Sequence, residues 1–284
     1  MSSIPVRKIR TEDKPLRSFD TFRIRDLKTL LNGKDMVQDL HRHDFYFILI
    51  LEKGRGSHSI DFVSYPVRNH AVFVLRPGQV HQLTLNKGST GYLIEFYRNM
   101  FQREQAQLLS EIGAKNNYQP EPNSFKKLVG LVAAIHTEYH DHRLLYQDVI
   151  RANMGILLIE LLRHRAIESG TGDQAESYAQ GQLDKLLNLI ETHVSTKKQV
   201  PQYADLMNLS PYQLNATTKA LLGKTCAQLI DEYVILESKR YLLATSNQVS
   251  LIARSLGYKD VSYFIRFFRK HTGHTPDAFR QNFK

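Results

Sequence analysis

The sequence is poor in cysteine and has no long apolar run. Its 284 residues include one cysteine, Cys226, so the chain cannot form an intramolecular disulfide. A single cysteine is typical of proteins in a reducing compartment. The longest purely apolar run, Phe45–Leu51, has seven residues, and a membrane-spanning helix needs about 20. The charged N-terminus, MSSIPVRKIRTEDK, lacks the apolar core of a signal peptide. We therefore expect a cytoplasmic protein without a membrane partner.

Positive charge is in excess, and much of it lies near the C-terminus. The formal net charge is +10 and the pI is about 9.5. Residues 254–284 contain seven Lys or Arg and two Asp, which amounts to half of that excess. A basic excess favours an anionic partner such as nucleic acid. The distribution of charge favours the C-terminal segment as the binding site for such a partner.

Residues from about 20 to 97 have the pattern of short strands. The segments FYFILIL (Phe45–Leu51), AVFVL (Ala71–Leu75) and GYLIEFY (Gly91–Tyr97) are rich in aromatic and aliphatic residues. Turn sequences containing glycine, KGRG, RPGQ and NKGS, separate them. Several strands at this spacing predict a small barrel or sandwich.

After about residue 98 the apolar period becomes that of helices. One predicted face contains Phe125, Leu128, Val132, Ile135 and Tyr139, and a second contains Val149, Ala152, Ile156 and Ile159. The second helix passes through MGILLIELL and is apolar nearly all round, so it needs cover on more than one side. The polar stretch ESGTGDQAESYAQGQ predicts a linker over residues 169–182.

The C-terminal third partly repeats itself. ADLMNLSPYQLNATTKALLGKT, from Ala204, aligns with ARSLGYKDVSYFIRFFRKHTGHT, from Ala253, on Gly223 and Gly273. Each copy predicts a short helix, a tight turn and a second helix that ends in glycine, which is the helix-turn-helix outline. Between the copies, Cys226–Ala244 predicts a helix of roughly 28 Å. Recognition helices one turn apart on B-DNA are separated by about 34 Å, so this helix is a suitable spacer.

The second helix of the second copy has two chemically different sides. On a helical wheel, Val261, Phe264 and Phe268 point one way, and Ser262, Arg266, Arg269 and Lys270 point the other way. Asp260 is placed to cap the helix N-terminus. Such a helix in isolation predicts an ordinary solvated face. The repeat and the local charge favour DNA, because arginine pairs bidentately with guanine and serine can serve several bases.

The segment GYKDVSYFIRFFRKHTGHTPDAFR (Gly257–Arg280) resembles the signature of the AraC/XylS family of bacterial transcription regulators, within a resemblance over Leu183–Phe283. The resemblance implies two helix-turn-helix units joined by a long helix, each reading a major groove. The base readers that it implies are Tyr212, Gln213, Asn215, Ala216, Val261, Ser262, Tyr263 and Arg266. Phosphate contacts are expected from Lys219, Arg269 and Lys270.

The first copy departs from this pattern. Ala216 stands where the family often has a cation, and Thr218 stands where it often has an aromatic residue. Cys226 and Tyr233 occupy common proline and arginine positions. We therefore predict a looser first unit and a second unit that supplies more of the affinity.

The front half, HRHDFYFILILEKGRGSHSIDF followed by LRPGQVHQL, is similar to the cupin-type sensor barrel that precedes the DNA-binding part in many family members. That similarity implies an effector pocket, for which the candidates are His43, Tyr46, His81 and Phe96.

Enzymatic cupins bind a metal through an H-x-H pair, a glutamate and a third histidine. His41 and His43 fit the pair and His81 fits the third position, but Phe47 and Ile48 stand where the glutamate is expected. We predict no metal and no cofactor on this ground. Three imidazoles still form a candidate ligand set for zinc or iron, because catalytic sites often use three protein ligands.

Together these patterns predict a multidomain α+β chain. The expected parts are a cupin-like effector-sensing barrel, a helical dimerisation and coupling segment, a linker, and an all-α double helix-turn-helix domain, over residues 1–97, 98–168, 169–182 and 183–284. The expected function is sequence-specific DNA binding by a transcription regulator under control of a small-molecule effector, and the family resemblance alone implies that it is an activator. It is not expected to be an enzyme. The expected partners are double-stranded DNA, the effector and a second copy of the chain, with RNA polymerase as a further candidate.

Two alternatives remain open. One is a cupin metalloenzyme fused to a DNA-binding tail, which the metal content of the protein would reveal. The other is a DNA-binding regulator without an effector, in which the barrel serves assembly only.

Overall fold

The computed structural model divides into two compact units, one over residues 5–170 and one that includes everything from residue 171 onward. The residues that it describes are 6–9, 22–101, 108–109, 111–113, 115–168 and 174–282. Among these residues, none of the helices has the length and apolar character that a membrane crossing requires.

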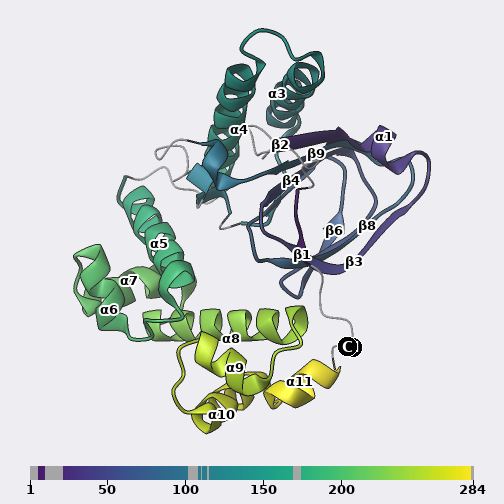
Figure 1. The fold of residues 1–284 in the computed structure, drawn as a ribbon. Helices are drawn as coiled ribbons and strands as arrows, with labels where there is room; N and C mark the ends of the chain where they lie inside the picture. Colours follow the sequence, from purple (N-terminus) through teal and green to yellow (C-terminus); the bar gives the residue numbers. More distant parts are fainter. Residues whose placement is uncertain are drawn as a thin grey trace. The chain divides into compact units, whose positions relative to one another are not determined.

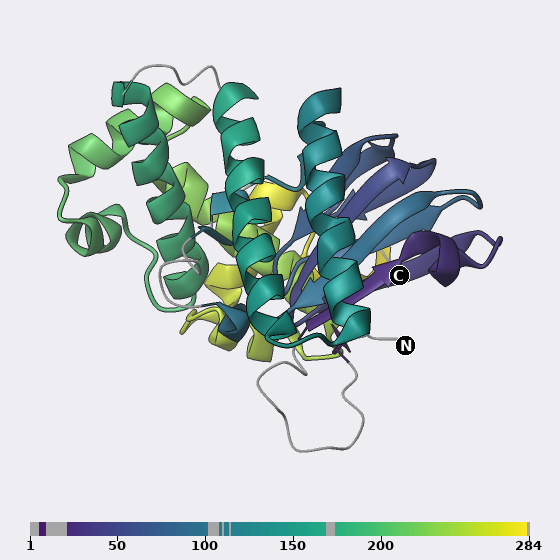
Figure 2. The same ribbon diagram turned by 90° about the horizontal axis from the view of Figure 1, so that it is seen from above.

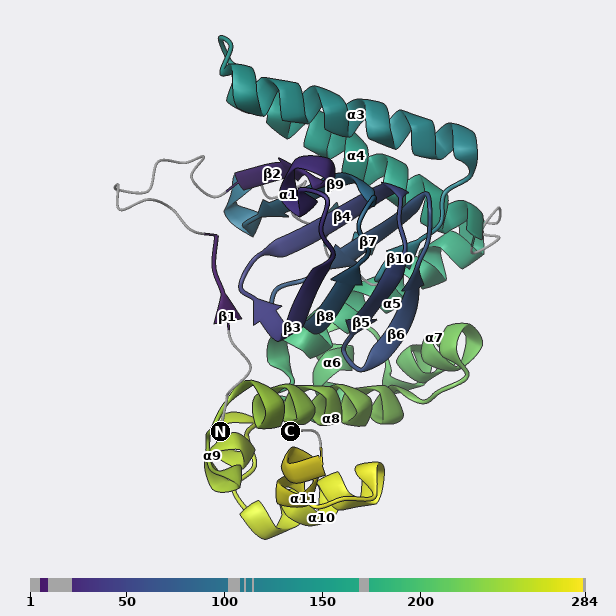
Figure 3. The ribbon, with the colours of Figure 1, turned by 90° about the vertical axis from the view of Figure 1, so that its right-hand side faces the viewer.

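The N-terminal unit contains two five-stranded sheets (Figures 1 and 3). The strand order of one sheet is β1 (Val6–Arg7), β3 (Met36–His43), β8 (Val80–Leu85), β5 (Gly56–Ile60) and β6 (Val63–Val67). The order of the other is β10 (Asn117–Tyr118), β7 (Ala71–Leu75), β4 (Tyr46–Lys53), β9 (Thr90–Phe96) and β2 (Phe22–Asp26). Short helices α1 (Leu27–Leu31) and η1 (Arg98–Met100) follow β2 and β9. The predicted fold class is confirmed, but the strands form two sheets instead of one closed barrel.

Strand β4 is buried on both faces, which explains why the run Phe45–Leu51 shows no alternation of apolar and polar residues. Phe47 and Leu49 belong to the core between the two sheets. Ile48 and Ile50 belong to a second core on the opposite face of the same sheet. Helices supply the other side of that second core, so every residue of the strand's central part is excluded from water.

The helices that cover this sheet are α3 (Pro122–Asp141) and α4 (Tyr146–Glu168), which lie side by side in Figure 2. The predicted face of α3 is confirmed: Phe125, Leu128, Val132 and Ile135 are buried. For α4 the predicted face is not the one that packs on the sheet. Its buried residues are Ile150, Met154, Leu157, Leu158 and Leu161. The face with Val149, Ala152, Ile156 and Ile159 is exposed, because an all-round apolar helix does not reveal from its sequence which side the sheet covers.

The C-terminal unit is all-helical over its described residues. It comprises α5 (Gln174–His193), α6 (Val200–Met207), α7 (Pro211–Leu222), α8 (Cys226–Ala244), α9 (Val249–Ser255), α10 (Val261–Thr272) and α11 (Pro276–Asn282). Helix α8 has the bounds predicted from the sequence, and in Figure 1 it runs between the pair α6–α7 and the group α9–α11. It therefore joins two helix-turn-helix units, α6–α7 and α9–α10.

The predicted linker over residues 169–182 is helical from Gln174, where α5 begins. Residues 169–173 lie outside the described part of the chain. The helical part is rich in Ala, Glu and Gln, which are good helix formers. These outweigh the single Gly181, which costs about 1 kcal/mol relative to alanine in a helix.

Candidate functional site

Helix α10 is fixed at both ends by features that the sequence predicts. At its start, the Asp260 carboxylate accepts hydrogen bonds from the backbone N–H groups of Ser262 at 2.8 Å and Tyr263 at 3.2 Å. At its end, Gly273 takes a left-handed conformation with φ of 78° and donates its N–H to the Arg269 carbonyl. Both caps satisfy backbone groups that a helix terminus leaves unpaired. The helix is therefore well defined without contacts to a ligand.

The two sides of α10 separate as the helical wheel predicts. Phe264 and Phe268 are fully buried, and Val261 is half-buried. The opposite side exposes Ser262, Tyr263, Arg266, Arg269 and Lys270. None of the three cations on this side forms an ion pair with a residue that the structure describes. Their charge is therefore available to a partner outside the chain.

An aromatic cluster holds α10 against its neighbours. The ring of Tyr258 lies 5.2 Å from that of Phe264, and the ring of Phe268 meets that of Phe279 edge-on at 5.5 Å. Edge-on aromatic pairs add to the stabilisation that burial alone provides. The second unit thus presents its basic side from a rigid support.

Helix α7, the counterpart of α10, is capped by a reciprocal pair. The backbone N–H of Gln213 donates to the Ser210 hydroxyl at 3.2 Å, and the Ser210 N–H donates to the Gln213 side-chain oxygen at 2.8 Å. Tyr212 is 83% exposed, and Ala216 and Lys219 are also exposed. Only the amide nitrogen of Gln213 is left to contact a base, because its oxygen serves the cap.

The side chain of Asn215, a predicted base reader, makes hydrogen bonds within the protein. Its side-chain N–H donates to the Pro211 carbonyl at 3.0 Å, and its side-chain oxygen accepts the Cys226 N–H at 3.0 Å. The amide therefore ties α7 to the first residue of α8. Both ends of the side chain are engaged within the protein, and the geometry opposes a role in base reading.

The first unit replaces an aromatic contact by a hydrogen bond. Thr218, which aligns with Phe268, is fully buried and donates its hydroxyl to the Asn215 carbonyl at 3.3 Å. Its hydrophobic partner on the same helix is Leu214. The two buried residues of α7, Leu214 and Thr218, are not aromatic, whereas those of α10, Phe264 and Phe268, both are.

A second connection between the two helix-turn-helix units could not be predicted from the sequence. Lys198, in the segment before α6, donates to the carbonyls of Val194 at 2.9 Å and of Leu256 in the second unit. Its ammonium group lies 4.9 Å from the centre of the Tyr258 ring. Next to it, Gly257 has a φ of 80°, and a Cβ there would lie 1.9 Å from the Ser195 carbonyl oxygen. The two units are therefore held by this contact as well as by α8.

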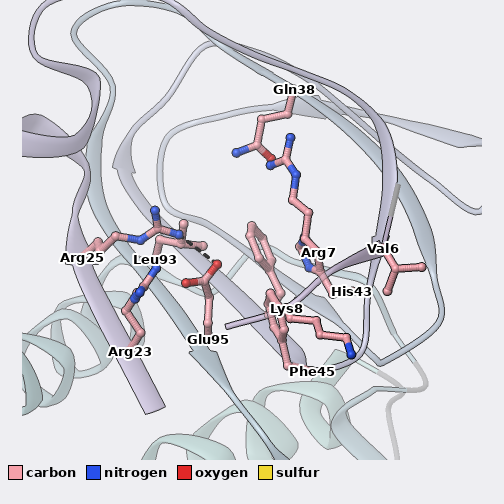
Figure 4. Close-up of a pocket in the computed structure, with 11 residues that line it drawn as sticks. Val6, Arg7, Lys8, Arg23, Arg25, Gln38, His43, Phe45, Leu93 and Glu95 are labelled. Carbon is pink, nitrogen blue, oxygen red and sulfur yellow. Dashed lines mark ion pairs between the residues drawn. The ribbon is translucent and has the colours of Figure 1, made fainter. Parts of the chain in front are cut away.

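The N-terminal unit contains a basic cavity of about 420 Å³ (Figure 4). Its cationic side chains are Arg7, Lys8, Arg23 and Arg25, and its other lining residues are Val6, Gln38, His43, Phe45, Phe47, Leu93 and Glu95. Arg25 pairs with Glu95 at 2.8 Å. Burial raises the pKa of the Glu95 carboxyl, although Arg25 opposes the shift. Four cations around one carboxylate make this cavity suitable for an anionic ligand.

Of the four predicted effector contacts, His43 lines this cavity and His81 lies in the interior behind it. Tyr46 and Phe96 do not reach it. Their rings stack at 5.4 Å in the core under α3 and α4, on the opposite face of their sheet. A strand that is buried on both faces shows no alternation of apolar and polar residues, so the sequence did not reveal which face these two residues occupy. The arginines were missed because β1 and β2 carry no motif.

Four histidines meet between the two sheets, beside this cavity. The Nε2 atoms of His41 and His43 lie 2.9 Å apart, and those of His43 and His81 lie 3.3 Å apart. The fourth, His58, places its Nε2 atom 2.9 Å from Nδ1 of His81. Burial lowers the pKa of all four rings, to about 4 for His41 and about 3 for His43 and His58. The rings are therefore neutral near pH 7.

Two domain families match the chain. An AraC-like ligand binding domain matches residues 34–147, and a helix-turn-helix domain matches residues 203–282. Together these ranges take in more than half of the chain, and neither is an enzyme domain.

Curated relatives agree with these matches. RhaS of Pectobacterium atrosepticum, an HTH-type transcriptional activator, is 23% identical over 262 residues, which cover 84% of this chain and 86% of RhaS. AdaA of Bacillus subtilis (strain 168), a bifunctional transcriptional activator and DNA repair enzyme, is 32% identical over 99 residues. That match covers 35% of this chain and 47% of AdaA, so it spans about half of the relative.

Solved structures with a similar chain include ToxT of Vibrio cholerae with bound unsaturated fatty acid. ToxT is 14% identical with a TM-score of 0.41, and the match covers 92% of this chain and 95% of ToxT. The C-terminal domain of AraT, a response regulator of Geobacillus stearothermophilus, is 26% identical with a TM-score of 0.33, covering 34% and 82% of the two chains. Because these TM-scores are low, the assignment rests on the two domain matches and the relatives: the chain belongs to the AraC family of transcription regulators.

Proposed function

We propose that the protein is a sequence-specific DNA-binding transcription regulator that responds to a small anionic effector. The observation that carries the proposal is the exposed side of α10. Ser262, Tyr263 and Arg266 lie together there on a helix that two buried phenylalanines fix in place. Arginine and serine at the N-terminal half of a helix can hydrogen-bond to base edges in the major groove.

Each of the two helix-turn-helix units contributes proposed contacts to bases and to the phosphate backbone. In the second unit the proposed base readers are Val261, Ser262, Tyr263 and Arg266, and in the first they are Tyr212, Ala216 and the amide nitrogen of Gln213. Lys219, Arg269 and Lys270 are exposed about one turn further along their helices, where they suit phosphate contacts. Phosphate contacts supply affinity and register, and base contacts supply sequence choice.

The effector site that we propose is the basic cavity of the N-terminal unit. Arg7 has no ion-pair partner among the described residues, and burial lowers its pKa, so a ligand carboxylate or phosphate would compensate its charge. Arg25 forms an ion pair with one carboxylate oxygen of Glu95, and the other oxygen has no hydrogen-bond partner among the residues that the structure describes. A small organic acid fits both the charge and the size of the cavity.

We propose that the regulator is a homodimer that uses the exposed side of α4. Val149, Ala152, Ile156 and Ile159 recur at spacings of three and four residues, the pattern of a two-helix seam. Val149, Ile156 and Ile159 are 36%, 44% and 39% exposed. A second copy would cover this stripe by the same stripe about a two-fold axis. The segment over residues 98–168 would then both cover the sheet and pair the subunits.

The stripe has a direct test in the sedimentation of the full chain. Ile156→Asp with Ile159→Asp should convert a dimer to a monomer, because the two charges would be buried in the seam. Val37→Asp is the matched control, since Val37 is 64% exposed on β3. A wild-type monomer at micromolar concentration, or a dimer that survives both changes, would contradict this interface.

Activation is the proposed sign of regulation, because the relatives RhaS and AdaA are both described as transcriptional activators. An activator of this kind would contact RNA polymerase and would act in the cytoplasm. The segments proposed to carry these roles are residues 1–97 for sensing, 98–168 for pairing and coupling, and 183–284 for DNA binding.

The experiment that tests the proposal is selection of bound sites from random and genomic DNA. It should use the full chain, with and without a panel of carboxylates and sugar phosphates. We expect a recurrent sequence bound more weakly as salt rises, because neutralised phosphates release counterions. Arg266→Ala should relax the sequence preference, whereas Arg163→Ala, on the exposed part of α4, should not. Binding that depends on neither sequence nor salt would contradict the proposal.

A further inference from the structure

The histidine cluster has the placement of a binding site. His41 and His43 are two residues apart on β3, and His81 lies directly opposite His41 on β8. His58 comes from β5, the next strand of the same sheet. His41, His58 and His81 are fully buried, and His43 is 5% exposed. Four imidazoles from three neighbouring strands thus meet in the interior, where histidine needs a partner for each ring nitrogen.

The spacing of the three converging nitrogens matches a coordination shell. Two nitrogen ligands of tetrahedral zinc, each at about 2.0–2.1 Å from the ion, are about 3.4 Å apart. The observed Nε2 separations are 2.9 Å between His41 and His43 and 3.3 Å between His43 and His81. The ligand atoms of His41, His43 and His81 all lie within 4.8 Å of one another. Small rotations of the rings would bring them to zinc distances without moving the strands.

The hydrogen bonds around the cluster leave lone pairs pointing inward. Nδ1 of His41 lies 2.7 Å from the Asp39 carbonyl oxygen, which can only accept, so the neutral ring carries its proton there. Its Nε2 is then a bare lone pair. His43 and His81 can place one proton between their Nε2 atoms, so at least two of the three converging nitrogens have no proton. Imidazole binds metals through such a lone pair.

His58 is placed to support this arrangement. When Nδ1 of His81 donates to Nε2 of His58, at 2.9 Å, Nε2 of His81 is free to bind a metal. The Asp39 carbonyl does the same for His41. Outer hydrogen bonds of this kind orient histidine ligands and select their tautomer. The other nitrogen of His58, Nδ1, is buried and has no hydrogen-bond partner in the described part of the chain, so packing of the ring alone does not explain a histidine here.

We infer that His41, His43 and His81 bind a divalent transition-metal ion and that His58 is their positioning residue. Zinc, iron, nickel and copper are the candidates, because imidazole suits these ions. The carboxylate expected from enzymatic cupins is replaced by Phe47, whose ring lies 5.4 Å from those of His43 and His81. Three neutral ligands leave the ion its full charge and an open position.

The basic cavity would give the ion a route into the interior and would hold an anionic ligand beside it. His43 lines the cavity, while His41 and His81 do not. An ion held by three neutral imidazoles needs a negative partner nearby, because an uncompensated buried charge is costly. The same cavity is proposed above for an organic acid, so that acid could complete the coordination shell. The metal site itself does not depend on DNA binding by the chain.

The test is metal uptake by the full chain, without a polyhistidine tag and after dialysis against a chelator. Zinc titration should give one ion per chain, and Co(II) should give the visible absorption of a four-coordinate nitrogen-ligated ion. Zinc at 100 times Kd should raise Tm by roughly 5–10 °C. His81→Gln should abolish these effects. His58→Phe should keep one ion per chain but weaken its binding about 10–100-fold.

His274→Gln is the matched control, since His274 is exposed in the C-terminal unit, and it should leave the titration unchanged. Two results would overturn the inference. One is a wild-type chain that takes up no stoichiometric zinc or cobalt at micromolar concentration. The other is a His81→Gln chain that binds zinc as tightly as the wild type. If His81→Gln fails to fold, the wild-type titration decides alone, and neither result bears on DNA binding.

Discussion

The first helix-turn-helix unit closes its core with Leu214 and Thr218, whereas the second uses Phe264 and Phe268 at the equivalent positions. The exposed faces of their recognition helices also differ, in the number of cations that they carry. Helix α7 carries one exposed cation, Lys219, and α10 carries three. Both recognition helices are capped at their start, and the first unit adds the Asn215 bridge to α8. The two copies thus share one backbone plan but differ in the residues that their recognition helices bury.

Phe268→Ala and Thr218→Ala should separate the two cores most strongly. Loss of a buried phenylalanine typically costs 3–5 kcal/mol, an expectation of about 4 kcal/mol for Phe268. Thr218→Ala should cost about 1 kcal/mol, since it removes one hydrogen bond and a methyl group. Hydrogen exchange of the full chain measures both, because it resolves α10 from α7. Equal loss of protection in the two units would show that the first core is as tightly packed as the second.

Exchange of the two turn residues should have a smaller effect. Asn208 and Gly257 both have a positive φ, of 54° and 80°. Gly257→Asn should destabilise the second unit by about 1–3 kcal/mol, because its Cβ would collide with the Ser195 carbonyl. Asn208→Gly should cost less than about 1 kcal/mol, since glycine accepts this conformation. A Tm of the Gly257→Asn chain equal to that of the wild type would contradict the close contact between the units.

Removal of single phosphate-facing cations should have the smallest effect on DNA affinity, and the effect should be similar in the two helix-turn-helix units. Lys219→Ala and Arg269→Ala should each weaken binding to all sequences uniformly and lower the salt slope by about 1. The double change Arg269→Ala with Lys270→Ala should lower the salt slope by about 2. The first unit cannot lose two cations in this way, because Ala220 occupies the position that aligns with Lys270. A titration of DNA binding against salt checks the three slopes. An unchanged slope would remove these side chains from the DNA interface.

The sequence predicted local features of the C-terminal unit well. The Asp260 cap, the glycine ends at Gly223 and Gly273, and the bounds of α8 all depend on neighbouring residues and are present in the structure. Long-range contacts were not predictable in this way. The bridge from Asn215 to Cys226 and the contact from Lys198 to Leu256 join segments whose meeting depends on the whole fold.

In the N-terminal unit, burial on two faces limited the prediction. Strand β4 shows no alternation, so Tyr46 was assigned to the pocket, although it faces the helices. His58 lies on β5 outside the three histidine positions of the cupin metal motif, and only the pairing of β5 with β8 brings it to His81. The arginines of the cavity come from β1, which pairs with β3 beside His43, and from β2 in the other sheet, so only the folded chain brings them together.

The central claim is that the second unit supplies more of the DNA affinity than the first. Its direct test compares Arg266→Ala with Tyr212→Ala on one selected operator at matched salt. Tyr212 represents the first unit because it is a proposed reader that is 83% exposed, whereas the Asn215 side chain is engaged within the protein. Arg266→Ala should raise Kd by about 5–150-fold, the equivalent of 1–3 kcal/mol for a bidentate base contact, and Tyr212→Ala should raise it less. An equal or larger loss from Tyr212→Ala would contradict the claim.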